Sequence, residues 1–219
     1  MERIKGLYYL RFDTKERKIK NELWKVLCNS FLQGYIDKES TVLDLGAGFC
    51  EFINNIDCKN KLAVDIDPEI RRFAADGVHT FITSCLDMRD IKDNSVDVAF
   101  SSELFEHLKN TDELLSGLLE VRRVLKDKGK LIILCPNIRY LSDRYWDFID
   151  HRLPLSHLGM QEALLLNNYK VLKVIPRFLP YTTKSLLPKS SIILKIYLKL
   201  PIIWRFFGKQ MLIIAEKKD

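Results

Sequence analysis

The feature that most constrains this chain is a glycine-containing turn placed directly after a short apolar strand. Residues 41–45 read Thr-Val-Leu-Asp-Leu, and Gly46-Ala47-Gly48 follows at once. Two glycines allow the backbone to turn tightly and let a ligand approach it without an intervening side chain. A helix that follows such a turn presents free N–H groups in its first turn. This combination predicts a ligand site at the carboxyl end of a strand.

Apolar runs and helical patterns alternate along most of the chain. The spacing of apolar residues predicts helices over 14–35 and 111–125, the second capped by Thr111, and Pro68 suits the first turn of a further helix. Such alternation predicts a parallel sheet with helices on both faces and right-handed crossovers. The expected strands are 41–45, 61–65, 78–84, 95–101, 130–135, 169–176 and 210–216.

Acidic residues follow the second and third expected strands. Asp65 lies 19 residues after Gly46, and a carboxylate at that strand end can accept hydrogen bonds from both hydroxyls of a ribose. Asp87 follows the third strand, where an acid or its neighbouring backbone can meet the edge of an adenine. Three strand ends therefore converge on a ligand of the size of adenosine.

The residues around the turn favour one adenosine cofactor over another. The third glycine of Gly-x-Gly-x-x-Gly, typical of dinucleotide sites, is missing, and Asp44 stands two residues before Gly46. A carboxylate there disfavours a pyrophosphate and suits a cationic amino-acid group. The sequence therefore favours S-adenosylmethionine over NAD, with a purely structural turn as the bland alternative.

Four motifs resemble those of class I S-adenosylmethionine-dependent methyltransferases. They are Val42-Leu-Asp-Leu-Gly-Ala-Gly48, Val64-Asp-Ile-Asp-Pro68, Asp93-Asn-Ser-Val-Asp97 and Arg123-Val-Leu-Lys126. The resemblance covers about residues 40–136. It implies an α/β, Rossmann-like, doubly wound, mostly parallel seven-stranded sheet with an antiparallel last strand, an N-terminal helix and a helical insertion before that strand.

The same resemblance implies roles for individual residues. Cys50 departs from it, because many members have a third glycine there, but Gly46 and Gly48 remain. The implied cofactor-binding residues are Asp44, Gly46 and Gly48 for the methionine part, Asp65 for the ribose, Asp87 and Met88 for the adenine, and Ser102 at the end of the fourth strand.

The remainder of the chain is similar to a narrower group of these enzymes, found among polysaccharide-biosynthesis genes. This similarity implies a sugar or glycan acceptor. The matching stretches are Phe105-Glu-His-Leu108, Pro136-Asn-Ile-Arg-Tyr140, Tyr145-Trp-Asp-Phe-Ile-Asp-His151 and Phe178-Leu-Pro-Tyr-Thr182.

Candidate catalytic groups follow the fourth strand. Methyl transfer to a hydroxyl requires alignment of the acceptor with the methyl group and removal of a proton. Glu103, Glu106 and His107 occupy this position, and a histidine side chain has an intrinsic pKa that suits a base at neutral pH. The alternative is that Glu106 and His107 only brace the cofactor site.

A second cluster follows the fifth strand, where an acceptor lid is expected. It contains Asp147, Asp150, His151 and His157. An Asp-His pair can orient a base, the same residues could bind a divalent ion, and they could equally anchor the loop. We select His151, His107 and Asp150 as catalytic and assign no metal site. Aromatic residues in this lid could stack on a sugar ring or simply pack: Tyr140, Tyr145 and Trp146.

The length of 219 residues is consistent with one methyltransferase domain. No apolar run reaches the roughly 20 residues of a membrane span, and the N-terminus has no signal-peptide core. Five scattered cysteines without a CxxC pair indicate free thiols. We expect an N-terminal cap at 1–39, a cofactor-binding core at 40–136, an acceptor lid at 137–168, and last strands at 169–219 that include a basic apolar insertion at 177–208.

The positive charge is concentrated near the C-terminus. The net charge is +6, yet residues 170–219 alone carry +9. Lysines there alternate with large aliphatic and aromatic residues, especially over 184–208, a pattern typical of a helix in a membrane interface. A helical cap or a subunit interface is the alternative, and we expect no nucleic-acid partner because a solvated basic stripe is missing.

These observations predict a cytoplasmic methyltransferase, located peripherally at the inner membrane face if the basic insertion binds lipid. Its expected reaction is O-methylation of a sugar or glycan intermediate, which could be lipid-linked. The alternatives are a small metabolite such as a quinone-like phenol as acceptor, a non-catalytic S-adenosylmethionine-binding module, and an NAD-dependent enzyme. The sequence does not indicate the oligomeric state.

Overall fold

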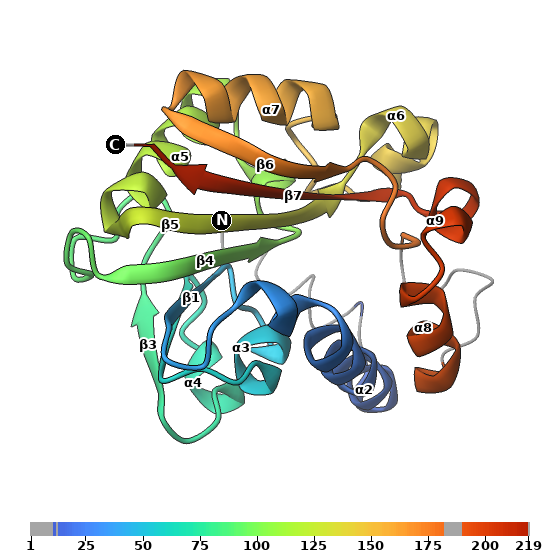
Figure 1. Ribbon diagram of the computed structural model, residues 1–219, viewed down its shortest axis with the longest axis horizontal. Helices are drawn as coiled ribbons and strands as arrows, with labels where there is room; N and C mark the ends of the chain where they lie inside the picture. Colours follow the sequence, from blue (N-terminus) through green and yellow to red (C-terminus); the bar gives the residue numbers. More distant parts are fainter. Residues whose placement is uncertain (1–10, 12, 182–189, 219) are drawn as a thin grey trace.

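The computed structural model describes residues 11, 13–181 and 190–218, which form a sheet covered by helices on both faces (Figure 1). The sheet has seven strands in the order β3-β2-β1-β4-β5-β7-β6. β7 is antiparallel to both β5 and β6, and the other neighbouring pairs are parallel. The strands are β1 (Thr41–Leu45), β2 (Asn60–Asp65), β3 (Val78–Ile82), β4 (Val96–Ser102), β5 (Leu125–Pro136), β6 (Tyr169–Ile175) and β7 (Gln210–Lys217).

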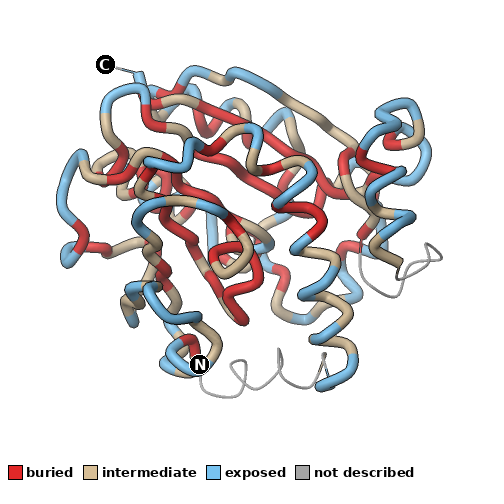
Figure 2. The backbone as a smooth tube through the Cα atoms, turned by 60° about the horizontal axis from the view of Figure 1, so that its bottom comes forward, coloured by how far each residue is buried: buried red, intermediate tan, exposed pale blue. Residues whose placement is uncertain are grey.

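Central strands are buried on both faces, as Figure 2 shows. In β5, Leu131 and Ile133 belong to one apolar cluster, whereas Ile132 and Leu134 belong to the other. Alternate side chains of a strand point to opposite faces, so a strand covered on both sides reads as a continuous apolar run. The structure therefore confirms the prediction that helices cover both faces of the sheet.

Each face has its own helices. α5 (Thr111–Val124) and α7 (His157–Leu166) cover one face, and α2 (Thr14–Ser30), α3 (Glu51–Asn55) and α8 (Ser191–Leu198) cover the other (Figure 1). The remaining short elements are α4 (Ile70–Phe73), α6 (Ile138–Leu141), α9 (Pro201–Phe207) and the 3₁₀ helices η1 (Leu32–Tyr35), η2 (Phe105–His107) and η3 (Ser142–Asp147).

Two helix predictions need correction. The helix expected over 14–35 ends at Ser30, because Phe31 leaves the helical conformation and packs its ring on Phe178. A 3₁₀ turn completes the segment. The cap of α5 is Asn110 rather than Thr111, since the Asn110 side chain accepts a hydrogen bond from the Glu113 N–H at 2.9 Å.

Some strand boundaries also differ. β3 ends at Ile82 rather than 84, whereas β5 begins at Leu125, five residues before the expected start. Leu125 pairs with Val96 ahead of a shift in register. Because residues 126–130 are four charged residues and one glycine, they carry no apolar strand pattern.

All five cysteines are free, as expected. Cys58 is half-buried and the other four are buried among apolar side chains. Within the described parts of the chain, no helix has both the length and the apolar character needed to cross a membrane. The insertion contains two short helices, α8 and α9, separated at Pro201; residues 182–189, which include part of the basic segment, lie outside the described residues.

Candidate functional site

The turn after β1 is fixed by the neighbouring strand. The N–H groups of Gly46 and Ala47 both donate to the carbonyl oxygen of Val64, at 2.8 and 3.1 Å. Gly46 and Gly48 have φ of +65° and +52°, a left-handed conformation that glycine adopts without strain. This geometry is what the sequence predicted for the turn. It lies beside the β1–β4 boundary, where the strand order reverses and ligands bind in open α/β sheets.

Asp65 ends β2 beside this turn. One of its carboxylate oxygens accepts the Gly48 N–H at 2.8 Å, and the other accepts the Asp67 N–H at 2.9 Å. Burial raises the pKa of Asp65, and these two backbone donors oppose the rise. Each oxygen keeps a further lone pair, so the carboxylate can still accept a hydrogen bond from a hydroxyl group. The structure thus brings Asp65 and Gly48 together as predicted.

Asp44 lies within β1 and is almost completely buried. Burial raises its pKa well above the usual range, the nearby Glu51 raises it further, and a hydrogen bond from the Ile53 backbone lowers it. A cationic group bound nearby would favour the ionised form of this carboxyl. Its contact with the cofactor amino group stays a prediction.

The residues expected to meet the adenine are less open to a ligand. Asp87 is half-buried and pairs with Arg89 at 2.6 Å. The Met88 side chain is fully buried, and its N–H donates to Glu120 at 2.7 Å. An adenine would therefore have to displace Arg89 or use another edge of this loop. Ser102 ends β4, opposite Leu134 of β5, and is half-buried.

Cys50 has a significance that the sequence reasoning missed. It has φ of +59° immediately before α3 and is fully buried. This left-handed conformation favours glycine. The cysteine therefore keeps the turn geometry at a cost in backbone strain.

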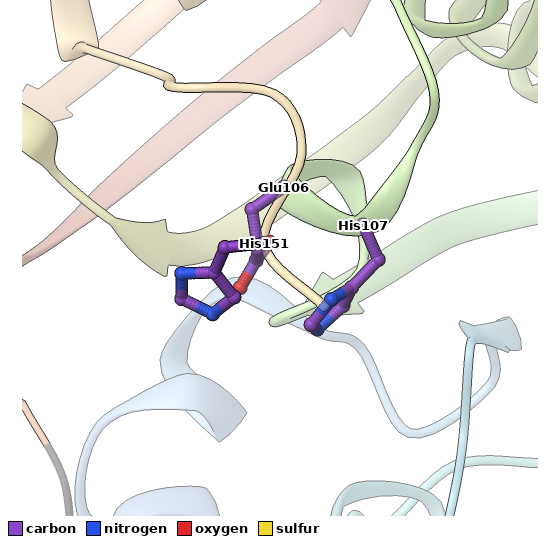
Figure 3. A group of neighbouring side chains, drawn as sticks. All are labelled: Glu106, His107 and His151. Carbon is purple, nitrogen blue, oxygen red and sulfur yellow. The ribbon is translucent and has the colours of Figure 1, made fainter. Parts of the chain in front are cut away.

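Glu106, His107 and His151 form a second group beyond the ends of β4 and β5 (Figure 3). Each offers a ligand atom, and these atoms lie within 4.8 Å of one another. The loop that carries His151 is tied to η2, because the N–H groups of Arg152 and Leu153 both donate to the Glu106 carbonyl oxygen, at 2.9 and 3.0 Å.

Asp150 joins this group through His107. The His107 ring contacts the Asp150 carbonyl oxygen through Nδ1 at 3.0 Å, and the Asp150 carboxylate lies 3.6 Å from the same nitrogen. Arg11 binds both carboxylate oxygens, at 3.0 and 2.5 Å. Burial acts to raise the pKa of Asp150, but the hydrogen bond from Arg11 and the charges of His107 and Arg11 together lower it below its usual value. The sequence offered no signal for Arg11, which lies 139 residues from its partner.

His151 is enclosed by aromatic rings. Tyr145 lies 4.7 Å and Phe148 5.2 Å from it, measured between ring centroids, and the Tyr181 hydroxyl is 3.3 Å from Nε2. Burial lowers the pKa of His151 to about 4, with the charge of His107 acting in the same direction. The imidazole is therefore neutral at pH 7.

Glu106 is fully buried, and neither carboxylate oxygen has a hydrogen-bond partner among the described residues. Burial raises its pKa well above the usual range, and Glu103 raises it further. Glu103 itself is exposed, has φ of +50° and accepts a hydrogen bond from Gln210.

A comparison with protein families identifies the central part of the chain. Residues 43–133 match the family described as "Methyltransferase domain". This central part of the chain is therefore similar to methyltransferase domains. The match contains the glycine turn, Asp65 and the β4 end, so it covers the elements that build the predicted cofactor site.

Solved structures agree with this methyltransferase fold. One is a SAM-dependent methyltransferase from Archaeoglobus fulgidus, with a TM-score of 0.68, 19% identity, and coverage of 96% of this chain and 99% of that one. A second comes from the complex of the Haloferax volcanii Trm112 methyltransferase activator with a protein named as a methyltransferase. It has a TM-score of 0.68, 17% identity, and coverage of 94% and 95%. A geranyl diphosphate methyltransferase in complex with SAM has a TM-score of 0.61, 17% identity, and coverage of 90% and 85%.

Among curated proteins, the chain is 32% identical over 129 residues to an uncharacterized protein from Methanocaldococcus jannaschii. The alignment covers 54% of this chain and 52% of that protein, so the chain spans about half the length of this relative. The methyltransferase fold and S-adenosylmethionine as its cofactor are thus supported, whereas these comparisons do not determine the acceptor.

The residues of the expected acceptor lid do not form the single cluster that the sequence predicted. His157 does not join His151: it contacts the buried Asn137 at 3.0 Å and lies parallel to Tyr140. Asp147 is exposed.

The aromatic lid residues also differ among themselves. Tyr145 is fully buried, and its hydroxyl donates to the Leu153 carbonyl oxygen, so it packs rather than stacking on a sugar. Trp146 is 54% exposed and remains available to a ligand.

Proposed function

We propose that this chain transfers the methyl group of S-adenosylmethionine to a hydroxyl oxygen of a sugar or glycan. The observation that carries the proposal is the Gly46–Gly48 turn with the Asp65 carboxylate bound to the Gly48 N–H at 2.8 Å. This arrangement suits the methionine and ribose parts of the cofactor, which supplies the electrophilic methyl group.

The histidine group supports a hydroxyl acceptor. A hydroxyl must lose a proton as its oxygen attacks the methyl carbon, and His107 and His151 lie beyond β4, the strand next to the cofactor turn. Asp150 would act as a positioning residue, since its carbonyl oxygen accepts the His107 Nδ1–H and leaves Nε2 with a free lone pair.

The test combines binding with turnover. Calorimetry with S-adenosylmethionine, S-adenosylhomocysteine and NAD identifies the cofactor. A methyl-transfer assay across nucleotide sugars, oligosaccharides, lipid-linked glycans and small phenols then identifies the acceptor class. We expect binding of the first two cofactor ligands and turnover with a saccharide. Turnover with phenols alone would favour the small-metabolite alternative, and binding without any turnover would favour a non-catalytic module.

The variant His151→Ala tests the role of the second group. We expect turnover to fall at least 100-fold while the affinity for S-adenosylmethionine stays within twofold, because the imidazole is surrounded by lid residues such as Tyr145 and Phe148. The matched control is His79→Ala, which removes an exposed imidazole from β3. Normal turnover in the His151 variant would remove this residue from the mechanism.

We further propose that α8 and α9 contact a membrane surface from the cytoplasmic side and so present a lipid-linked acceptor. The supporting observation is a set of exposed apolar side chains beside the exposed basic residues Lys195, Lys199 and Arg205. Basic residues reach lipid headgroups while apolar ones enter the interface. The apolar set is Ile192, Ile193, Ile196, Leu200, Ile202, Phe206 and Phe207.

Vesicle co-sedimentation tests this surface. The full chain should bind vesicles that contain anionic lipid, and Ile202→Ser with Phe206→Ser should reduce binding at least tenfold. The control pair is Leu165→Ser with Leu166→Ser on α7, where the side chains are 57% and 71% exposed. Equal sedimentation of both pairs, or none for the unmodified chain, would contradict membrane contact.

A further inference from the structure

We propose that Glu106, His107 and His151 hold a divalent first-row transition-metal ion, such as Zn²⁺, beside the acceptor. Two imidazoles and one carboxylate form a donor set that such ions favour over Mg²⁺ or Ca²⁺. The residues come from η2 and from the loop after η3, and their ligand atoms lie within 4.8 Å of one another (Figure 3). The site itself is independent of the proposed reaction; its role in catalysis rests on the proposed function.

The buried carboxylate of Glu106 is the first argument for an ion. Its side chain is completely buried, and neither oxygen has a hydrogen-bond partner among the residues that the structure describes. A buried carboxyl group without partners is costly, and buried charges are normally paired or bound to a metal. Nδ1 of the buried His151 also lacks a partner there. The Glu106 carboxylate and the His151 imidazole therefore have free lone pairs in the same buried cluster.

The surroundings of the two histidines are the second argument. His107 directs Nδ1 toward the Asp150 carbonyl oxygen at 3.0 Å, and His151 directs Nε2 toward the Tyr181 hydroxyl at 3.3 Å. A metal-bound histidine usually donates its other ring N–H to such an oxygen, which fixes the ring and its tautomer. Nε2 of His107 and Nδ1 of His151 thereby remain as ligand atoms. Arg11 binds both oxygens of the Asp150 carboxylate, so this carboxylate is not available as a metal ligand.

An ion would need only a small inward adjustment of the three side chains. Zn–N and Zn–O distances of about 2.0–2.2 Å place neighbouring ligand atoms roughly 3.4 Å apart in a tetrahedron. The observed limit of 4.8 Å therefore requires movement of about 1 Å. Three protein ligands also leave a coordination position open, as in catalytic rather than structural sites.

The open position has a direct use in methyl transfer. With the ion bound, His107 and His151 would be ligands rather than bases, and an acceptor hydroxyl on the ion would have a lowered pKa and lose its proton to water. The resulting oxygen then attacks the methyl carbon: the C–O bond forms, the C–S bond breaks, and its electron pair stays on sulfur. The products are the methyl ether and S-adenosylhomocysteine. No oxidant or reductant is needed.

The test measures metal binding by the full chain without cofactor or acceptor. After treatment with a chelator and its removal, calorimetric titration with ZnCl₂ should show one ion per chain. Glu106→Gln and His151→Gln should each weaken zinc binding at least 100-fold, because each removes one of the three ligand groups. His79→Gln is the control. Circular dichroism confirms folding, and Glu106→Asp replaces the glutamine variant if that variant does not fold.

The outcomes separate this site from the proposed function. A Kd weaker than about 100 μM for the unmodified chain, or binding that neither Glu106→Gln nor His151→Gln weakens, would overturn the metal site. Stoichiometric binding lost in these variants supports the site even if no saccharide is methylated. Methyl transfer that continues unchanged in a metal-free protein would support the proposed function and overturn the role of the ion.

Discussion

Gly46 is the residue on which the cofactor turn most directly depends. Its φ of +65° is costly for other residues, and an added Cβ would lie 2.9 Å from Cδ1 of Leu104. Because the leucine end can move, the backbone strain dominates. We expect Gly46→Ala to lower the free energy of unfolding by about 1–2 kcal/mol, as measured by urea denaturation. Calorimetry should show S-adenosylmethionine affinity at least tenfold weaker.

Gly34→Ala is the matched control, since an added Cβ there meets no atom within 4 Å and the residue has no positive φ. If both alanine variants bound the cofactor equally well, the turn would not form the binding site.

Asp44 makes the stability of the ligand-free protein depend on pH. Its folded-state pKa is raised, chiefly by burial, so the folded state holds the proton more tightly than the unfolded state. The stabilising effect is complete below the unfolded-state pKa of about 3.9 and is lost as the pH rises through the higher folded-state value. Asp44→Asn should therefore stabilise the protein more at pH 8 than at pH 5, as measured by urea denaturation.

The control for this pH series is Asp57→Asn. Asp57 is exposed, and its pKa is lowered by the hydrogen bond from Lys38, so its effect has the opposite direction. A constant difference between Asp44→Asn and the unmodified protein across this range would show that Asp44 does not titrate abnormally.

Residue-level predictions from sequence succeeded where a motif is local. The glycine turn and Asp65 lie within one β1–turn–α3–β2 unit, so their spacing in the sequence determined their contact. His107 and His151 are 44 positions apart and meet only because the lid folds back onto η2 through the Arg152 and Leu153 N–H groups. No local sequence pattern encodes that contact. The sequence likewise gave no reason to separate His157 from His107 and His151.

At the scale of elements, Arg123 connects α5 to the loop that follows β3. Its guanidinium donates to the carbonyl oxygens of Met88 at 2.9 Å and Ile91 at 3.0 Å, and it also binds Glu120 and Asp93. This loop carries Asp87 and Met88, the residues implied for the adenine. The arginine of the Arg-Val-Leu-Lys motif thus holds the loop after β3 against α5, a role that the resemblance alone did not explain.

Replacing Arg123 should loosen that loop. We expect Arg123→Ala to lower the free energy of unfolding by about 2–3 kcal/mol, because buried carbonyl groups lose charge-assisted hydrogen bonds. Amide hydrogen exchange over residues 84–91 should become faster. The control is Arg122→Ala on the same helix, where the guanidinium donates to the Lys218 carbonyl oxygen, away from this loop. Unchanged exchange in the Arg123 variant would contradict this role.

Apolar runs bounded by turn residues predicted the strands well, because the central strands are buried on both faces and read as apolar runs. Boundaries failed where tertiary contacts decide them. Phe31 ends α2 early because its ring packs on Phe178, and the charged residues at the start of β5 pair with β4 without an apolar pattern. The helices of the insertion, α8 and α9, were indicated only as one apolar segment.

At the scale of the whole molecule, a cofactor bound at the β1–β4 boundary should stabilise the fold. That boundary lies in the middle of the sheet, and one apolar cluster packs on each face of the sheet. A cofactor bound there would therefore contact strands that belong to both clusters. Ligand at 100 times its Kd adds about 2.7 kcal/mol, which raises Tm by about 5–10 °C for a chain of this length. Thermal melts should show this shift with S-adenosylmethionine and S-adenosylhomocysteine.

NAD at the same concentration is the comparison ligand and should leave Tm unchanged. A shift with NAD equal to that with S-adenosylmethionine would indicate a dinucleotide site instead.

The position of β7 between β5 and β6 has a consequence for how the chain is made. β6 ends at Ile175, yet it cannot join the sheet until β7, which begins at Gln210, has been synthesised. Translation at about 5–20 residues per second makes this delay on the order of two to seven seconds. Throughout that interval the apolar edge of β5 is unpaired in the nascent protein. The basic insertion prolongs this exposure, so the ribosome-bound chain is a natural substrate for chaperones that recognise open strand edges.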